Sequence, residues 1–242
     1  MLPDGLLTDY ATKFYGFGTW RAKIWFVGIE EAGGVQESDV QARLDTWRKS
    51  NSRDLEDAPT FYPASGNMLW HGKGATLQPT WKQLIRVLLV ARGQAATNEE
   101  ILNYQRSTFG RTGGRECLAE LLPLPSPSAA AWNYHKWSKL TWLKTRDGYQ
   151  KYVSLGRAYA IQQKLEQHHP RVVIFYSSTW HRLWGLIARG SWGQAIPSKL
   201  MGLDRDGISF YVMRHPRAES DAYFRTIGEF LRMKHRSQSG RV

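Results

Sequence analysis

Two short polar segments that follow apolar runs carry the side chains best suited to chemistry. Glu30 and Glu31 come shortly after residues 23–28 (KIWFVG), and His215 follows residues 208–213 (ISFYVM). A carboxylate can stabilise a developing positive charge and hold a water molecule for attack. A histidine, even when neutral, can donate a hydrogen bond to a departing anion. Either residue type could instead cap a helix or lie in the core, so the fold decides between these interpretations.

Four apolar runs of strand length would position these residues. Two have just been named, and the others are residues 116–122 (ECLAELL) and 171–176 (RVVIFY). Helical patterns separate the runs, with capping-box signals at Thr80 and Thr97 and a longer helix over about 149–168. Strands that alternate with helices predict an α/β fold, here a three-layer α/β/α sandwich with a central, mostly parallel four-stranded sheet.

The loops after the four strands are the expected location of the site. In open α/β sheets, ligands bind beyond the carboxyl ends of the strands. Each predicted strand is followed there by polar or Gly/Pro-rich residues, namely 29–34, 123–128, 177–179 and 214–217. We therefore expect these loops to converge on one cleft.

The amino-acid composition limits the kinds of partner and cofactor that the protein could bind. The chain has 33 Lys and Arg against 21 Asp and Glu, and its formal net charge of +12 favours a polyanion such as DNA. Cys117 is the only cysteine, which excludes an internal disulfide, a CxxC redox pair and a four-cysteine iron–sulfur cluster. No His/Cys/Asp spacing is typical of zinc, so we expect neither metal nor redox cofactor. Without a targeting or membrane-length apolar segment, we expect a cytoplasmic monomer that does not contact membranes.

Three segments together resemble the uracil-DNA glycosylase superfamily. Residues 27–33 (VGIEEAG) resemble its first motif, in which a strand ends in Gly and an Asp, Asn or Glu positions the attacking water. His215-Pro216-Arg217 resembles the second motif, His-Pro-Ser, and residues 121–128 (LLPLPSPS) resemble a Pro-rich loop of several families. The chain departs from the mismatch-specific branches in having Glu31 in place of Pro, and Arg217 replaces the Ser of the second motif.

The resemblance implies one uracil-DNA glycosylase-like domain over residues 1–242, with 1–20 as an N-terminal extension and 233–242 as a basic tail. It implies a monofunctional DNA glycosylase that flips a base out of DNA and hydrolyses its bond to the sugar, leaving an abasic site. Glu30 would stabilise the oxocarbenium-like sugar and hold the water. His215 would donate to the leaving base. Glu31 could exchange roles with Glu30.

The resemblance also suggests residues that bind the base. Tyr62 would stack on the flipped base and Asn67 would be a polar contact, although aromatic residues are abundant here and core packing explains one such as Tyr62 more often than not. Glu120 lies near the position where the superfamily commonly has an Asn that reads uracil. An ionised Glu only accepts hydrogen bonds and would favour a base that donates, such as cytosine. The substrate is therefore uracil by default or a modified cytosine of the kind found in phage DNA, with base excision repair or anti-phage defence as the pathway.

Candidate DNA contacts lie in the same four loops. Serine hydroxyls would bind phosphates, and the arginines beside the second motif would reach the minor groove. These residues are Ser126, Ser128, Ser177, Ser178, Arg214 and Arg217. Two other classes stay open: a catalytically inactive nucleic-acid-binding module of the same fold, and a small-molecule nucleotide hydrolase. The carboxylate and histidine at both motif positions argue against the first, and the net charge of +12 argues against the second.

Overall fold

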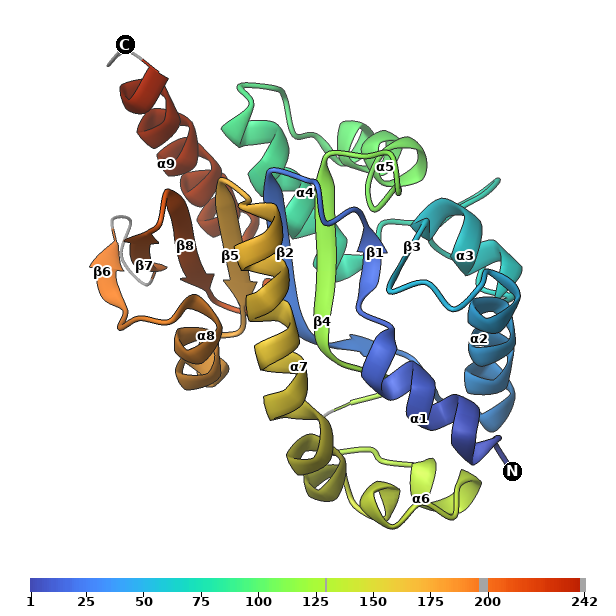
Figure 1. Cartoon of the computed structure of the whole chain (residues 1–242). Helices are drawn as coiled ribbons and strands as arrows, with labels where there is room; N and C mark the ends of the chain where they lie inside the picture. Colours follow the sequence, from blue (N-terminus) through green and yellow to red (C-terminus); the bar gives the residue numbers. More distant parts are fainter. Residues whose placement is uncertain (129, 196–199, 240–242) are drawn as a thin grey trace.

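The computed structural model describes residues 1–128, 130–195 and 200–239, which form a sheet with helices on both faces (Figure 1). The sheet has eight strands in the order β3-β1-β4-β2-β5-β8-β7-β6. Its centre consists of β4 (Glu116–Ser126), β2 (Ile24–Ala32), β5 (Val172–Tyr176) and β8 (Ile208–Met213), and these neighbours are parallel. The expected α/β class and mostly parallel centre are confirmed, whereas the expected total of four strands is wrong.

The additional strands are short and lie at the two edges of the sheet. They are β1 (Gly16–Gly18), β3 (Leu55–Glu56), β6 (Gly193–Ala195) and β7 (Leu200–Arg205). β1 is antiparallel to β4, and β7 is antiparallel to β8. None of them has a long apolar run, because β1, β3 and β6 have three residues or fewer and β7 (LMGLDR) ends in polar residues. Hydrophobic patterning therefore does not indicate them.

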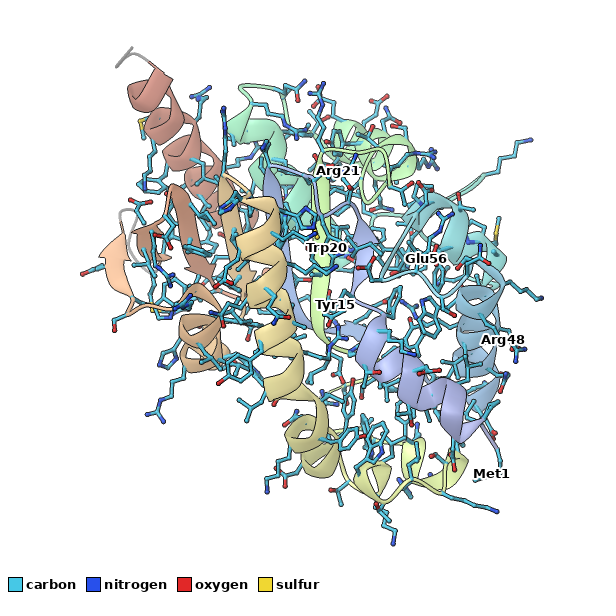
Figure 2. All side chains as sticks on the ribbon, viewed as in Figure 1. Met1, Tyr15, Trp20, Arg21, Arg48 and Glu56 are labelled. Carbon is cyan, nitrogen blue, oxygen red and sulfur yellow. The ribbon has the colours of Figure 1, made fainter. Side chains whose placement is uncertain are left out.

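The N-terminal residues belong to the fold instead of extending from it. Residues 1–20 form α1 (Asp4–Lys13) and β1, and Tyr10 and Phe14 are buried in the core. Tyr15 and Trp20, labelled in Figure 2, pack against each other with ring centroids 5.5 Å apart. These contacts close the β4 side of the sheet.

The helices cover both faces of the sheet, with α7 and α8 in front and α4 and α9 behind in Figure 1. The remaining helices in chain order are α2 (Glu37–Lys49), α3 (Ala58–Ala64), α4 (Pro79–Ala91), α5 (Asn98–Ser107), α6 (Tyr134–Trp137), α7 (Arg146–His168), α8 (His181–Ala188) and α9 (Asp221–Ser239). Within the described part of the chain, no helix is both long and apolar enough to cross a membrane.

Helix starts follow the sequence signals only in part. The capping box at Thr97 is confirmed, since Thr97 and Glu100 exchange hydrogen bonds at the start of α5. The one expected at Thr80 is wrong, because Gln78 caps α4 by accepting from the Trp81 N–H. The expected basic tail also differs, because the backbone of residues 233–239 continues α9.

Candidate active site

The carboxyl ends of the central strands bring the four expected loops to one edge of the sheet. Glu30 and Glu31 end β2, Glu120 lies in the neighbouring β4, and Tyr176 ends β5. The Tyr176 hydroxyl donates to Glu120 Oε1 over 2.6 Å. The Tyr176 ring lies edge-on to His215, with ring centroids 6.3 Å apart. Side chains from β2, β4, β5 and the segment after β8 therefore meet here.

Glu30 is a nearly buried carboxylate with one unengaged oxygen. Its side chain is 9% exposed, and Oε2 forms an ion pair with Arg146 at the start of α7. Oε1 is buried and has no hydrogen-bond partner among the described residues. Burial raises the pKa of Glu30 to about 7, and the charge of Arg146 limits the rise. Glu30 therefore changes its protonation state near neutral pH.

Arg146 is held in place by the loop after β4. Its Nη1 donates to Ser126 Oγ over 2.9 Å and to the Ser128 carbonyl over 3.1 Å. The sequence did not single out Arg146, because the predicted helix began near residue 149. A signal existed, since Thr145 caps α7 by accepting from the Gly148 N–H. A capping threonine places the next residue in the first turn, at the mouth of the site.

Glu31, in contrast, has both oxygens engaged. The Arg43 guanidinium donates to Oε1 over 3.1 Å and also to Oε2, and the Tyr62 hydroxyl donates to Oε1. Arg43 is itself fixed by a 2.6 Å hydrogen bond from its Nε to the Tyr10 hydroxyl. Glu31 thus ties the end of β2 to α2 and α3, whereas neighbouring Glu30 has one oxygen that no described group contacts.

Tyr62, expected to stack on a flipped base, lies in the core. It is 2% exposed, and its ring contacts Phe17, Trp81 and His71 at centroid distances of 5.0, 5.4 and 5.7 Å. The ring is covered because it packs in this aromatic cluster while its hydroxyl holds Glu31. Its place in the fold is that of a packing and positioning residue, with no free face for stacking.

The charge state of Glu120 differs from the one expected from the sequence. Its Oε2 is buried without a hydrogen-bond partner in the described part of the chain. Burial raises the pKa of Glu120 to about 8; the hydrogen bond from Tyr176 opposes this rise, and the charges of Glu31 and Glu30 add to it. The expected ionised acceptor is therefore a neutral acid at neutral pH, which can donate as well as accept.

Gly28 provides the space for this pair. A Cβ at Gly28 would overlap both the Tyr176 hydroxyl and Glu120 Oε2. Gly28 and Glu120 are register partners in β2 and β4. The main chain around Glu120 is fixed as well, because buried Arg157 donates to the carbonyls of Leu121 and Glu120 over 2.6 and 2.7 Å.

His215 is half-buried and has a defined tautomer. Its Nδ1 accepts a hydrogen bond from the Arg217 backbone N–H over 3.2 Å, so the proton of the neutral ring is on Nε2. Burial, together with the charge of Arg217, lowers the pKa of His215. The ring is therefore neutral at neutral pH and has an Nε2–H group to donate.

The four serines are not equivalent. Ser126 and Ser177 are buried, and the Ser126 hydroxyl is used inside the loop, where it donates to the carbonyls of Ser128 and Ala131. The Ser177 hydroxyl is paired with Thr179 at 2.9 Å. The structure therefore does not present Ser126 and Ser177 to a phosphate. Ser128 is exposed and Ser178 is half-buried.

The two candidate arginines after β8 are both exposed. Arg214 forms an ion pair with Glu219 at 2.6 Å. Arg217 uses its backbone N–H for His215, as described above, while its side chain lies at the surface. Both positions are accessible to a large partner.

A polar pocket of about 280 Å³ opens beside Glu31. This is near the lower end of volumes typical of small-ligand sites, roughly 300 Å³. It is bounded by the ends of β2 and β4, by α2 and by the loop after α3. Its lining residues are Glu31, Ala32, Gly34, Asp39, Arg43, Ser65, Gly66, Asn67, Met68, Leu69 and Pro125. The predicted polar contact Asn67 is therefore a wall of this pocket.

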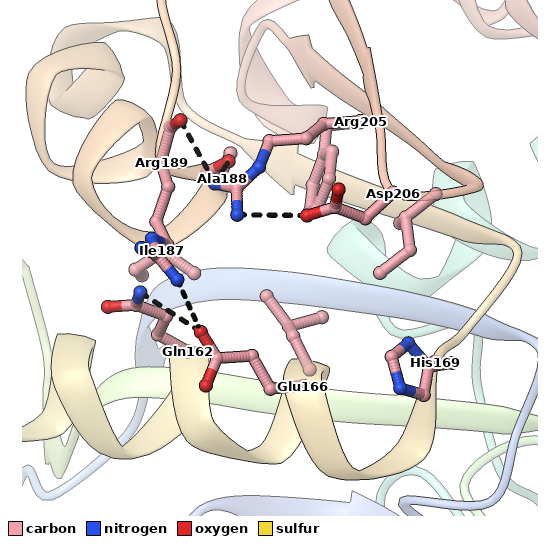
Figure 3. A pocket seen from close by; sticks show the side chains of 11 residues that line it. Gln162, Glu166, His169, Ile187, Ala188, Arg189, Arg205 and Asp206 are labelled. Atoms are coloured by element: carbon pink, nitrogen blue, oxygen red, sulfur yellow. Dashed lines mark hydrogen bonds and ion pairs between the residues drawn. The ribbon is translucent and has the colours of Figure 1, made fainter.

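A second hollow lies at the other end of the sheet, between the end of α7 and the start of β8 (Figure 3). Its volume is about 40 Å³. The charged groups around it pair with each other, Arg189 with Glu166 at 2.8 Å and Arg205 with Asp206 at 2.9 Å. It is small and electrostatically satisfied, so the strand ends remain the candidate site.

Neither models of known protein families nor curated protein sequences give a match to this chain. Within residues 1–128, 130–195 and 200–239, no three His, Cys, Asp or Glu side chains are grouped so that they could hold a metal ion. The arrangement of side chains at the strand ends is therefore the basis for assigning a function.

Proposed function

We propose that the protein is a monofunctional DNA glycosylase, which flips a base out of DNA and hydrolyses its N-glycosidic bond. One observation carries this proposal. Glu30, a carboxylate with one buried oxygen that has no hydrogen-bond partner among the described residues and a pKa of about 7, lies at the same strand ends as neutral His215 with its Nε2–H. These are the two groups that the reaction needs, one for the sugar and one for the base.

In the proposed reaction, the bond between C1′ and the base nitrogen breaks, and its electron pair leaves with the base. The Glu30 carboxylate stabilises the positive charge that develops on the sugar. It also accepts a proton from the water molecule that attacks C1′, giving the hydroxyl of the abasic sugar. His215 donates a hydrogen bond from Nε2 to an oxygen of the leaving base and so stabilises its negative charge.

The charge state of Glu120 supports a uracil-type base. A neutral carboxyl group can donate to a ring carbonyl, such as O4 of uracil, from its protonated oxygen. The preference for cytosine depended on an ionised Glu120, and a pKa of about 8 removes that reason. We therefore rank uracil ahead of a modified cytosine. The base excised would decide between repair and defence as the pathway.

The test is excision from a panel of oligonucleotides that carry uracil, thymine or modified cytosines, with alkali to reveal abasic sites. We expect strand breaks for one class of base with the wild-type protein and almost none with Glu30→Gln or His215→Ala. Glu166→Gln is the matched control, since Glu166 is an exposed carboxylate on α7. DNA binding with no excision of any base would support an inactive binding module. Hydrolysis of free nucleosides alone would support the small-molecule hydrolase.

A further inference from the structure

Three positively charged side chains stand in a row at the amino edge of the central sheet, opposite the candidate site. Lys23, Arg115 and Arg171 immediately precede the first paired residues of β2, β4 and β5. In the sheet these strands are neighbours in the order β4-β2-β5. Adjacent strands lie about 4.8 Å apart, so the row is about 10 Å long. All three side chains are exposed, and none forms an ion pair with a described residue.

Arg21 extends this positive region towards the end of α7. It is exposed and lies in the turn just before β2 (Figure 2). Desolvation lowers the pKa of His168, and the positive charges of Lys164 and Arg21 lower it further. Nearby Asp54 is already paired with Lys164 at 3.0 Å. The amino edge therefore has a positive potential that the surrounding acidic side chains do not cancel.

Elsewhere along the central strands, the cations are matched by carboxylates. At the carboxyl edge, Arg146 is paired with Glu30. On the amino side of β8, Arg205 is paired with Asp206 at 2.9 Å (Figure 3). Like charges on neighbouring strands repel each other and lower stability. The unpaired row is therefore unfavourable in the free protein, and a ligand with negative charges would relieve the repulsion.

A polar hollow of about 310 Å³ adjoins the row beside Arg115. Its lining residues are Arg92, Gln94, Tyr104, Thr108 and Arg115. The charge of Arg92 is balanced by Glu116 at 2.7 Å, and its guanidinium also donates to the Tyr104 hydroxyl over 2.6 Å. Arg115 thus brings an unbalanced positive charge to this hollow, and exposed Gln94 adds an amide that can donate and accept.

We propose that the amino edge of the sheet is a second nucleic-acid-binding surface, at which Lys23, Arg115 and Arg171 contact successive phosphates. Each strand of a duplex carries one negative charge per about 3.4 Å of helix axis, so a row about 10 Å long faces about three phosphates. Arginine guanidinium groups bind phosphate through two parallel hydrogen bonds. An extended acidic peptide presents side chains on one face only about every 7 Å, which matches the row less well.

This surface is separate from the candidate active site and does not depend on the proposed chemistry. Lys23 precedes Glu30 by seven residues of β2 and its approach, which corresponds to about 23 Å at about 3.3 Å per residue. The two sites lie at opposite edges of the sheet. One chain can therefore hold two segments of nucleic acid at once, one at each edge.

The experiment compares the wild-type protein with the triple variant Lys23→Gln/Arg115→Gln/Arg171→Gln. The probe is a short undamaged DNA duplex, and sedimentation velocity at several salt concentrations measures how many duplexes bind and how tightly. The wild type should bind two duplexes at low salt, and the triple variant should bind one. For the wild type, log K of the second step should fall by about 2.7 per unit of log salt, because each of three phosphate contacts contributes about 0.9.

Two further variants serve as controls. One removes the same number of positive charges from exposed residues that are each paired with an acid, and it should still bind two duplexes: Lys13→Gln/Lys151→Gln/Arg189→Gln. The other, Arg115→Lys/Arg171→Lys, keeps the charges of the row and should also bind two. Circular dichroism should show that all variants are folded, since the replaced side chains are exposed.

The possible outcomes separate this surface from the proposed function. One duplex per wild-type chain, or two on the triple variant, would overturn the second surface whether or not a base is excised. Two duplexes on the wild type without excision would leave the surface standing and reject the glycosylase. If the triple variant binds DNA normally but loses binding to polyglutamate, phosphatidylserine vesicles or inorganic triphosphate, the edge binds an acidic protein, a membrane or a small anion, and the proposal is wrong.

Discussion

The burial of Glu30, opposed by its ion pair with Arg146, sets the pH at which the proposed chemistry operates. Only the ionised carboxylate can stabilise the sugar cation, and the pKa of Glu30 is about 7. The rate of excision should therefore rise as pH increases from about 5.5 through the inflection of Glu30 near 7, and fall above about 8, where Glu120 loses the proton that it donates. Arg146 lowers the pKa of Glu30, so Arg146→Met should move the inflection to higher pH. Single-turnover rates against pH measure both effects.

Arg189→Met is the control for this profile, because Arg189 pairs with exposed Glu166 far along α7. It should leave the inflection unchanged. Glu120 is the second carboxyl group of the site whose pKa is raised, to about 8. Glu120→Gln removes its titration from the profile and leaves that of Glu30. A wild-type inflection that vanishes in Glu120→Gln, and not in Arg146→Met, would assign the titration to Glu120 instead.

Gly28 is a second position where one added carbon atom should change the stability of the protein. Gly28→Ala would push a methyl group into the Tyr176–Glu120 pair, so we expect a loss of about 1–3 kcal/mol in the free energy of unfolding, typical of overpacking. Gly156→Ala is the matched control, because a Cβ on that exposed helical glycine meets nothing within 4 Å. It should stabilise the protein by about 0.5–1 kcal/mol. Denaturant unfolding measures both, and equal effects would contradict the steric account.

At the scale of elements, Arg43 joins α2 to the end of β2. Arg43→Met would leave the largely buried Glu31 without its cation, and breaking such a pair costs about 3–5 kcal/mol. Arg43→Met/Glu31→Gln should recover a large part of this loss, because the second change removes the unpaired charge. Urea unfolding of the two variants makes the comparison. If the double variant is as unstable as the single one, packing against the aromatic rings is the main contribution of Arg43.

The elements that the sequence predicted are those with continuous apolar runs. β2, β4, β5 and β8 are covered on both faces, so almost every side chain in them must be apolar. β3, with only Leu55 and Glu56, has too few residues to form a pattern. The same limit applies to β1 (Gly16–Gly18), in the segment 1–20 that was expected to be an N-terminal extension.

The place of the candidate residues in the fold was predictable from the sequence, whereas the protonation state and burial of their side chains were less so. Strand ends identify Glu30 and His215, because a parallel sheet gathers its carboxyl ends at one edge. The burial of Tyr62 and the neutral form of Glu120 depend on residues distant in sequence, such as Trp81 and Tyr176. A local pattern contains no information about such neighbours, so these expectations, like the phosphate contacts of buried Ser126 and Ser177, were changed by the structure.

At the scale of the whole molecule, the excess of positive charge predicts a salt-dependent association. Binding to undamaged duplex DNA should weaken as salt increases, with log K falling by about 0.9 for each phosphate contact per unit of log salt. Fluorescence anisotropy between 50 and 300 mM salt, roughly the range in which such slopes are measured, gives the slope. Arg217→Gln should reduce it by about one contact if that exposed side chain binds a phosphate. A slope near zero would contradict DNA as the partner.

The order of the central strands also has a consequence for the nascent chain during translation. β2 lies between β4 and β5, both of which follow it in sequence, so its apolar residues have no partner strand until β4 has been synthesised. Residues 33–115 separate the two strands, which is 83 residues and corresponds to about 4–17 s of translation at about 5–20 residues per second. During that interval the nascent chain exposes an unpaired strand, IWFVG, to the cell. A chaperone that binds extended apolar segments would therefore have its main substrate in the first quarter of this protein.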